Sequence, residues 1–299
     1  MKALFWTIVA LVGLLGCGCR PAKKGEPAHR FPIPSAPATM GREAQIDYLA
    51  THYWDHFPFA DTVAIVAADS AEMMRRFAQF IALVEHREGN RAPMDSLMRR
   101  ATSSRTALDY FARMAEEVLH DPNSPLRSSE LYIPVLEAWL RAPYYNAYER
   151  IVPEHDLHLA RQNRIGEAAN DFPFVTRDGG HGTLYRLEAE HTLIFFSNPG
   201  CAMCEMLKEL VLSSAVIIER IGEGRLKLLM LYPDEDLRAW EREADDAEGW
   251  IDARDATGVL RREELYDLRA IPSMYLLDGQ KRVLVKDSTD PREIEQALQ

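Results

Sequence analysis

The stretch His191-Thr-Leu-Ile-Phe-Phe-Ser-Asn-Pro-Gly-Cys-Ala-Met-Cys204 decides the fold of the second half of this chain. Its first six residues are mostly apolar, β-branched or aromatic, which is typical of a buried strand. Ser197 to Gly200 end that run, and apolar residues then recur at helical spacing at Met206, Leu207, Leu210 and Val211. The pattern therefore predicts a strand, a short loop and a helix whose first turn contains both cysteines.

Cys201 and Cys204 are spaced for redox chemistry. Two residues at i and i+3 in the first turn of a helix lie close enough for their sulfur atoms to bond. The free N–H groups at a helix N-terminus stabilise a thiolate, and thiols of this motif have pKa values lowered from about 8.5 to roughly 3.5–7.5. We therefore expect Cys201 to attack a substrate disulfide and Cys204 to resolve the mixed disulfide.

The rest of the sequence from residue 166 onward alternates strand-like and helix-like segments. Strands are expected over 172–176, 183–187, 226–232, 274–277 and 282–285, and helices over 235–244 and 291–298. Asp178-Gly179-Gly180 has the composition of a hairpin turn. This alternation predicts an α/β sheet with at least one crossover connection.

With these elements, residues 166–299 resemble the thioredoxin-fold lipoproteins and thiol–disulfide oxidoreductases of the cytochrome-maturation or peroxiredoxin-like type. Four features carry the resemblance: Gly166-x-x-Ala169-x-Asp171-Phe172, Asp178-Gly179, Phe195-Phe196 before the cysteines, and Ile271-Pro272 before a strand. The resemblance implies a thioredoxin-like fold, which is a central mixed sheet flanked by helices. In the family a proline at the place of Pro272 is cis and packs against the disulfide. The backbone of Ile271 is then exposed to the substrate chain.

Two positions depart from the pattern of that family. Gly200 stands where an aromatic residue, commonly Trp, usually precedes the first cysteine. Phe195 stands where thioredoxins carry a buried Asp that assists proton transfer to the resolving thiol. The expected reaction uses the two sulfur atoms alone, so we expect no cofactor and no metal.

Residues 43–165 have a helical pattern with no fixed repeat, which predicts an all-α domain of unknown function. One apolar helix face comprises Met73, Phe77, Phe80, Ile81 and Val84. Ser70 stands just before that face, where an N-cap is expected. Leu108 to Leu119 contain a second such face, and residues 129–140 and 144–164 are also expected to be helical.

Residues 1–16 have the pattern of a lipoprotein signal peptide. Lys2 is followed by the uncharged apolar run Ala3 to Leu15, and Leu14-Leu15-Gly16-Cys17 resembles the lipobox, in which cleavage leaves a lipidated Cys17. Residues 17–42 are rich in proline and read as a flexible tether. We therefore expect an exported lipoprotein of the cell envelope, anchored in the outer membrane and facing the periplasm.

Composition restricts the partners. The chain of 299 residues has 35 basic and 46 acidic side chains, for a net charge of -11, which argues against a general nucleic-acid binder. Its four cysteines are too few for a disulfide scaffold. We expect the partners to be cysteine-containing envelope proteins or a membrane electron donor.

Two other interpretations stay open at this point. The chain could be an envelope interaction protein whose thioredoxin-like half is a non-catalytic scaffold. It could also bind Cu(I) through the soft sulfur atoms of Cys201, Met203, Cys204 and Met206, although we expect Met206 to pack in the core. His52 and His56, at helical spacing, are a weaker metal candidate.

Overall fold

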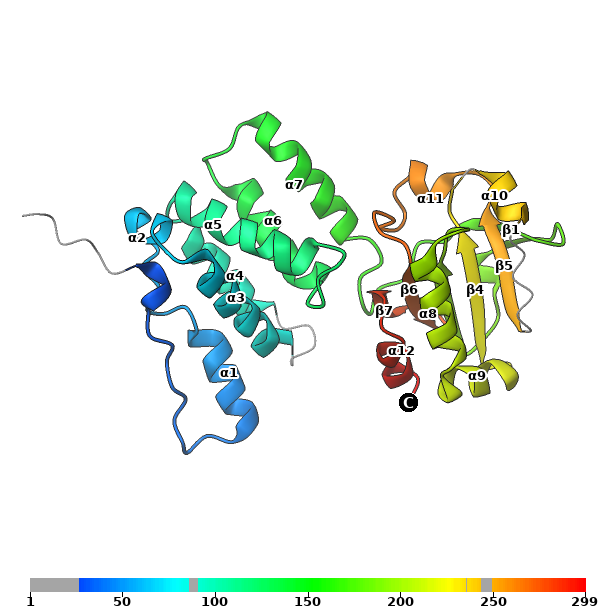
Figure 1. The fold of residues 1–299 in the computed structure, drawn as a ribbon, viewed down its shortest axis with the longest axis horizontal. Coiled ribbons are helices and arrows are strands. Elements are labelled where there is room, and N and C mark those ends of the chain that lie inside the picture. Colours follow the sequence, from blue (N-terminus) through cyan, green and yellow to red (C-terminus); the bar gives the residue numbers. More distant parts are fainter. Residues whose placement is uncertain (1–26, 86–90, 235, 243–248) are drawn as a thin grey trace, which may run out of the picture.

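The computed structural model describes residues 27–85, 91–234, 236–242 and 249–299, which form two bodies lying side by side (Figure 1). The first body is helical and the second is a mixed sheet flanked by helices, so the predicted fold class is confirmed. The proposed signal peptide and Cys17 lie outside the described residues, as does Cys19. No helix within the described ranges is long and apolar enough to cross a membrane.

The helical body follows the predicted periodicity closely. It contains α1 (Arg42–His52), α2 (Thr62–Val66), α3 (Ser70–Glu85), α4 (Ala92–Ala101), α5 (Arg105–Ala115), the π-helical turn η2 (Glu116–His120), α6 (Ser129–Arg141) and α7 (Ala147–Ala160), after the short turn η1 (Ala28–Arg30). The expected cap of α3 is one residue off. Ser70 is already inside the helix, and Asp69 accepts the N–H of Glu72 at 2.9 Å.

Aromatic rings form the centre of the helical body. Trp54 is 3% exposed and lies within ring-contact distance of six aromatic side chains, namely Phe31, Tyr53, Phe57, Phe77, Phe80 and Phe111. These rings come from the residue after η1, the α1–α2 loop, α3 and α5, so one cluster links these four segments.

His52 and His56, the weaker metal candidate, do not share a helix face. Helix α1 ends at His52, so His56 lies in the following turn, and His52 Nδ1 instead lies 2.7 Å from Asp55 Oδ2. Within the described residues, no group of three His, Cys, Asp or Glu side chains is arranged to hold a metal ion.

The second body is built on one seven-stranded sheet with the order β2-β1-β5-β4-β3-β6-β7. The strands are β1 (Pro173–Thr176), β2 (His181–Thr183), β3 (His191–Phe196), β4 (Leu226–Tyr232), β5 (Trp250–Asp255), β6 (Ser273–Asp278) and β7 (Val283–Ser288). β3, β4 and β5 are parallel, whereas β6 runs antiparallel to β3 and to β7.

Two segments differ from the sequence expectation. The strand expected over 183–187 ends at Thr183, and Leu184–Arg186 forms a 3-10 turn. β5 is a strand that the apolar pattern did not indicate, because only Ala253 and Asp255 of its six residues are buried. Its pairing with β4 and β1 makes it part of the sheet.

Helices cover both faces of the sheet. Leu193 and Phe195 of β3 point to the face covered by α8 (Ala202–Leu212), α9 (Ala215–Gly222) and α12 (Pro291–Ala297). Ile194 and Phe196 point to the opposite face, where they pack with the buried residues around α11 (Val259–Arg262). α10 (Leu237–Arg242) follows β4 and lies near β1 and β5 in Figure 1.

Candidate redox site

The two predicted parts of the site meet at one edge of the sheet. Phe196, the last residue of β3, pairs with Ser273, the first residue of β6. Because these strands are antiparallel, the loop that leads to Cys201 and the segment that contains Pro272 lie at the same edge. The Ile271–Pro272 peptide bond is cis, as the family resemblance implied. Pro272 is buried and Ile271 is partly exposed.

Cys201 and Cys204 form a disulfide at the N-terminus of α8. Their Cα atoms are 5.2 Å apart, within the usual range for a disulfide. Cys201 is the N-cap residue, and its sulfur accepts the backbone N–H of Cys204 at 3.2 Å. The same N–H would stabilise a Cys201 thiolate after reduction.

The two sulfur atoms differ in access to solvent. Cys204 is 1% exposed, whereas Cys201 is partly exposed. A substrate can therefore approach Cys201 and not Cys204. This asymmetry fits the predicted division into a nucleophile and a resolving thiol.

A buried aromatic ring and an ion pair lie on the elements that carry the cysteines. Phe195 is buried in the same cluster as Leu207 of α8, so an apolar ring occupies the place of the carboxylate that thioredoxins have. Lys208 Nζ lies 2.6 Å from Glu205 Oε2. Both residues line a cavity of about 70 Å³ next to the loop over 197–199.

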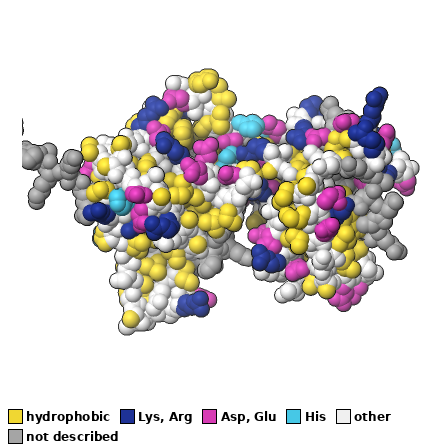
Figure 2. Space-filling view, viewed as in Figure 1, with side chains coloured by type: hydrophobic (Ala, Val, Ile, Leu, Met, Phe, Trp, Pro, Cys, Tyr) yellow, Lys and Arg dark blue, Asp and Glu magenta, His cyan; other side chains and the backbone are white. Residues whose placement is uncertain are grey.

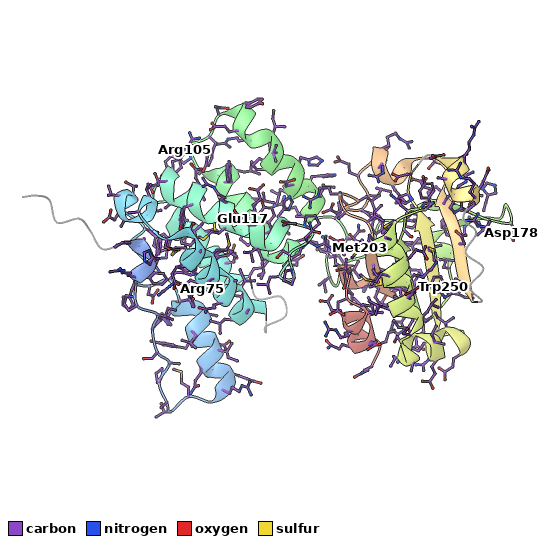
Figure 3. All side chains as sticks on the ribbon, in the orientation of Figure 1. Arg75, Arg105, Glu117, Asp178, Met203 and Trp250 are labelled. Atoms are coloured by element: carbon purple, nitrogen blue, oxygen red, sulfur yellow. A yellow bond between two sulfur atoms is a disulfide. The ribbon has the colours of Figure 1, made fainter. Side chains whose placement is uncertain are left out.

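Met206 does not pack in the core, so that prediction is wrong. The buried face of α8 consists of Cys204, Leu207 and Val211, and Met206 is 48% exposed. Met206 shares its exposed face with Met203, which Figure 3 labels at the edge of the sheet body nearer the helical body. The apolar periodicity of this helix thus has two faces, and only tertiary packing distinguishes them.

One solved structure matches the chain across most of its length. A thioredoxin-like protein from Bacteroides caccae is 33% identical, with a TM-score of 0.84 over 90% of this chain and 98% of that one. The chain belongs to the thioredoxin-like family. Residues 17–163 of this thioredoxin-like protein, a range that includes α1 to α7, match a domain of unknown function (DUF5106). No curated protein matches the chain.

Other solved structures match less than half of the chain. The C-terminal domain of an uncharacterized protein from Bacteroides fragilis is 42% identical, covering 46% of this chain and 97% of its own, with a TM-score of 0.44. The thioredoxin domain of a thiol-disulfide oxidoreductase from Bacteroides vulgatus is 13% identical, covering 46% of this chain and 99% of its own, with a TM-score of 0.39.

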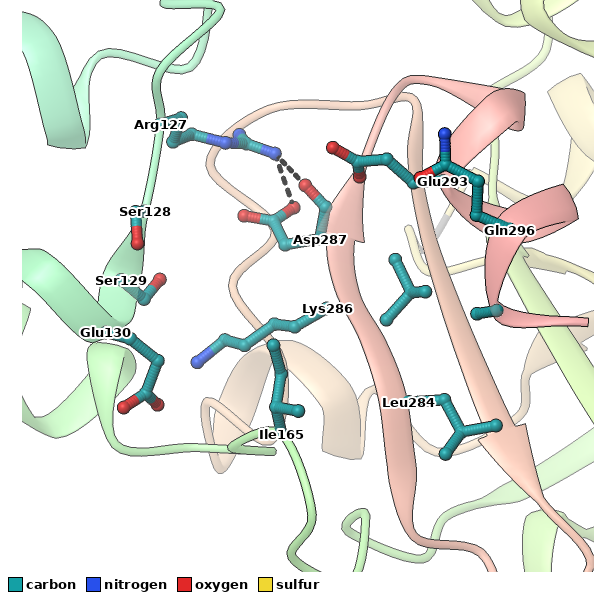
Figure 4. A pocket seen from close by; sticks show the side chains of 12 residues that line it. Arg127, Ser128, Ser129, Glu130, Ile165, Leu284, Lys286, Asp287, Glu293 and Gln296 are labelled. Atoms are coloured by element: carbon teal, nitrogen blue, oxygen red, sulfur yellow. Dashed lines mark hydrogen bonds and ion pairs between the residues drawn. The ribbon is translucent and has the colours of Figure 1, made fainter. Parts of the chain in front are cut away.

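A buried carboxylate that the sequence did not indicate lies directly behind the cis-proline segment of the thioredoxin-like domain. Ser273 donates its hydroxyl to Asp287 Oδ1 at 2.6 Å, and Arg127 of the helical domain lies 2.9 Å from the same oxygen (Figure 4). Burial raises the pKa of Asp287 to about 6. No local pattern predicts this contact, because Arg127 and Asp287 are 160 residues apart in the chain.

Replacing Asp287 with asparagine is expected to change how stability depends on pH. The raised pKa means that the folded state binds more protons than the unfolded state between about pH 4 and pH 6, so this group lowers the free energy of unfolding as the pH rises. The effect amounts to about 3 kcal/mol by pH 7.

The Asp287→Asn protein lacks the carboxyl group whose protonation causes this pH dependence. Its free energy of unfolding relative to the unchanged protein should therefore rise by about 2 kcal/mol from pH 4 to pH 7 in urea titrations at the two pH values. An equal difference at both pH values would show that Asp287 keeps its ordinary pKa.

Proposed function

We propose that this protein is an exported, lipid-anchored thiol–disulfide oxidoreductase. The observation that carries the proposal is the asymmetric Cys201–Cys204 pair at a helix N-terminus, with the cis-bonded Pro272 at the same edge of the sheet. The substrates are cysteine-containing proteins of the cell envelope, and a membrane electron donor is the partner that returns electrons to the pair. Leu14-Leu15-Gly16-Cys17 supports the lipid anchor and an envelope location.

The reaction is a pair of thiol–disulfide exchanges. The Cys201 thiolate attacks one sulfur of a substrate disulfide, which forms a Cys201–substrate disulfide and releases the other substrate sulfur as a thiolate. Cys204, once deprotonated, attacks the Cys201 sulfur, and the second substrate thiolate leaves. The substrate gains two electrons and the pair becomes the disulfide; the reverse sequence oxidises a substrate dithiol.

The difference in solvent exposure between the two cysteines suits both the attack on the substrate and the resolving step. The partly exposed Cys201 meets the substrate, while the buried Cys204 is shielded from it and lies 5.2 Å away between Cα atoms, within reach of the Cys201 sulfur. Glu205 and Lys208, which follow Cys204 on the same helix, form an ion pair with each other.

The full chain with Cys204→Ser is expected to accumulate mixed disulfides with envelope proteins, because the resolving step is lost while Cys201 still reacts. Non-reducing gels of the membrane fraction should show adducts that a thiol reductant removes. The unchanged protein should also shift on gels after thiol alkylation, according to whether the pair was reduced or oxidised.

The matched control is the double variant Cys201→Ser, Cys204→Ser, which should form no adducts. If Cys204→Ser forms none either, and the unchanged protein shows no redox-dependent shift, the proposed function is wrong.

A further inference from the structure

On the C-terminal side of the cis-proline segment, the helical domain reaches Ser273 through Asp287 of β7. Ser273, next to Pro272, donates its hydroxyl to Asp287, and Arg127 from the loop before α6 pairs with that carboxylate and with the Asp287 carbonyl oxygen. Asp287 has a positive φ of 53°, and the β6–β7 register shifts near it. Such an irregularity turns a side chain away from the regular alternation, and here the carboxylate faces Ser273 and Arg127.

The helical domain also contacts the segment on its N-terminal side. Arg269, two residues before Ile271, donates to Asp267 at 2.8 Å and to the ring of His120 in η2. His120 stacks on Tyr132 with ring centroids 4.5 Å apart, and its Nε2 lies 3.4 Å from Asp156. Burial, and then the Arg269 cation, lower the pKa of His120, which favours a neutral ring that can accept from Arg269.

Further contacts continue this interface along the linker. Lys286 donates to the carbonyl oxygens of Ala160 and Gln162, at 2.8 and 2.6 Å, at the C-terminus of α7. Asn163 donates to the carbonyl oxygen of Leu265 at 2.7 Å. Figure 2 shows charged side chains and histidines at the junction of the two domains. The junction is therefore a continuous set of directional contacts that reaches the cis-proline segment.

These contacts involve groups that are unfavourable to bury without partners. Asp287 is buried, and Arg127 is its cationic partner from the other domain. A carboxylate held in this way has one favourable position, which fixes Ser273 through its hydroxyl. We name His120, Arg127, Arg269 and Asp287 the interdomain clasp.

We propose that the helical domain is a positioning part of the redox site. Through the interdomain clasp, His120 and Arg127 hold the segment 269–273 from both sides, so that the backbone of Ile271 is presented to the polypeptide chain of a protein substrate. This inference rests on the proposed function. It assigns the domain of unknown function a role in recognising protein disulfides, and none in the exchange chemistry of the sulfur atoms.

The test compares the full chain with its Arg127→Ala and Arg127→Lys variants, and uses Arg105→Ala as the matched control. Arg105 also forms ion pairs, with Asp109 and Glu149, but both partners lie within the helical domain. Three quantities are measured: hydrogen exchange of the backbone over 269–274, kinetics with a peptide disulfide and with oxidised glutathione, and the reduction potential of the cysteine pair.

Arg127→Ala is expected to exchange about tenfold faster over 269–274 and to raise KM for the peptide disulfide about fivefold. Its rate with oxidised glutathione and its reduction potential should stay unchanged, since the clasp does not touch the sulfur atoms. Arg127→Lys, which retains a donor to Asp287, should restore part of both effects, and Arg105→Ala should behave as the unchanged protein.

Unchanged hydrogen exchange over 269–274 in Arg127→Ala overturns the inference, whatever the activity. So does an equal loss of rate with both disulfides. If Arg127→Ala does not fold, the same comparison is made with His120→Gln, which removes the contact on the other side. A protein that exchanges no disulfide while Arg127→Ala loosens the segment would refute the proposed function, and with it the role in recognising protein disulfides, while the hold of the clasp on the segment would stand.

Discussion

Cys201→Ser is expected to lower the rate of disulfide exchange about 10³-fold, because a serine hydroxyl does not ionise at neutral pH and forms no disulfide. Cys201 is the sulfur that a substrate can reach, since Cys204 is almost fully buried. Its helix N-cap position and the N–H of Cys204 stabilise the thiolate that reacts. The rate is measured as the appearance of free thiol when the reduced full chain meets a peptide disulfide.

Cys19→Ser is the control, because it removes a thiol of the same kind outside the motif. It should exchange disulfides at the rate of the unchanged protein. A Cys201→Ser protein that retained activity within tenfold would contradict the assignment of Cys201 as the nucleophile.

Trp54→Ala is expected to lower the free energy of unfolding of the helical domain by about 3–5 kcal/mol, the usual range for emptying a buried aromatic site. The indole contacts rings from the residue after η1, α3 and α5, including Phe31, Phe77 and Phe111, so its loss opens a cavity where these segments meet. Urea unfolding followed by helical circular dichroism measures the change, because most helices belong to this domain.

Tyr148→Ala is the matched control for aromatic truncation. Tyr148 is 82% exposed on α7, and its removal should change the free energy of unfolding by about 0.5 kcal/mol or less. A Trp54→Ala protein within 1 kcal/mol of the unchanged protein would mean that the aromatic cluster does not carry the stability of the domain.

Much of the fold could be predicted because its signals are local. The run of β3 and the periodicity of α3 arise from residues within one element, and the structure has both where the sequence placed them. β5 could not be predicted in the same way. Its charged residues are accommodated by neighbours, as when Asp252 accepts from the indole N–H of Trp240 at 3.1 Å.

The candidate site also has one feature that the sequence predicts locally and one that only the tertiary structure decides. The spacing of Cys201 and Cys204 indicates a pair at a helix N-terminus, and the structure has a disulfide there. Which face of α8 is buried does not follow from its apolar residues, because Met206 and Leu207 are both apolar and only Leu207 meets the sheet.

The sequence by itself determined a two-part chain, with helices first and a cysteine pair between a strand and a helix second. Those features depend on residues a few positions apart, whose spacing is set by the geometry of one helix or strand. Only the tertiary structure decided that Arg127 and His120 reach the segment around Ile271 and Pro272. Contacts across 160 and 149 residues arise from the packing of two completed domains, and no local periodicity encodes them.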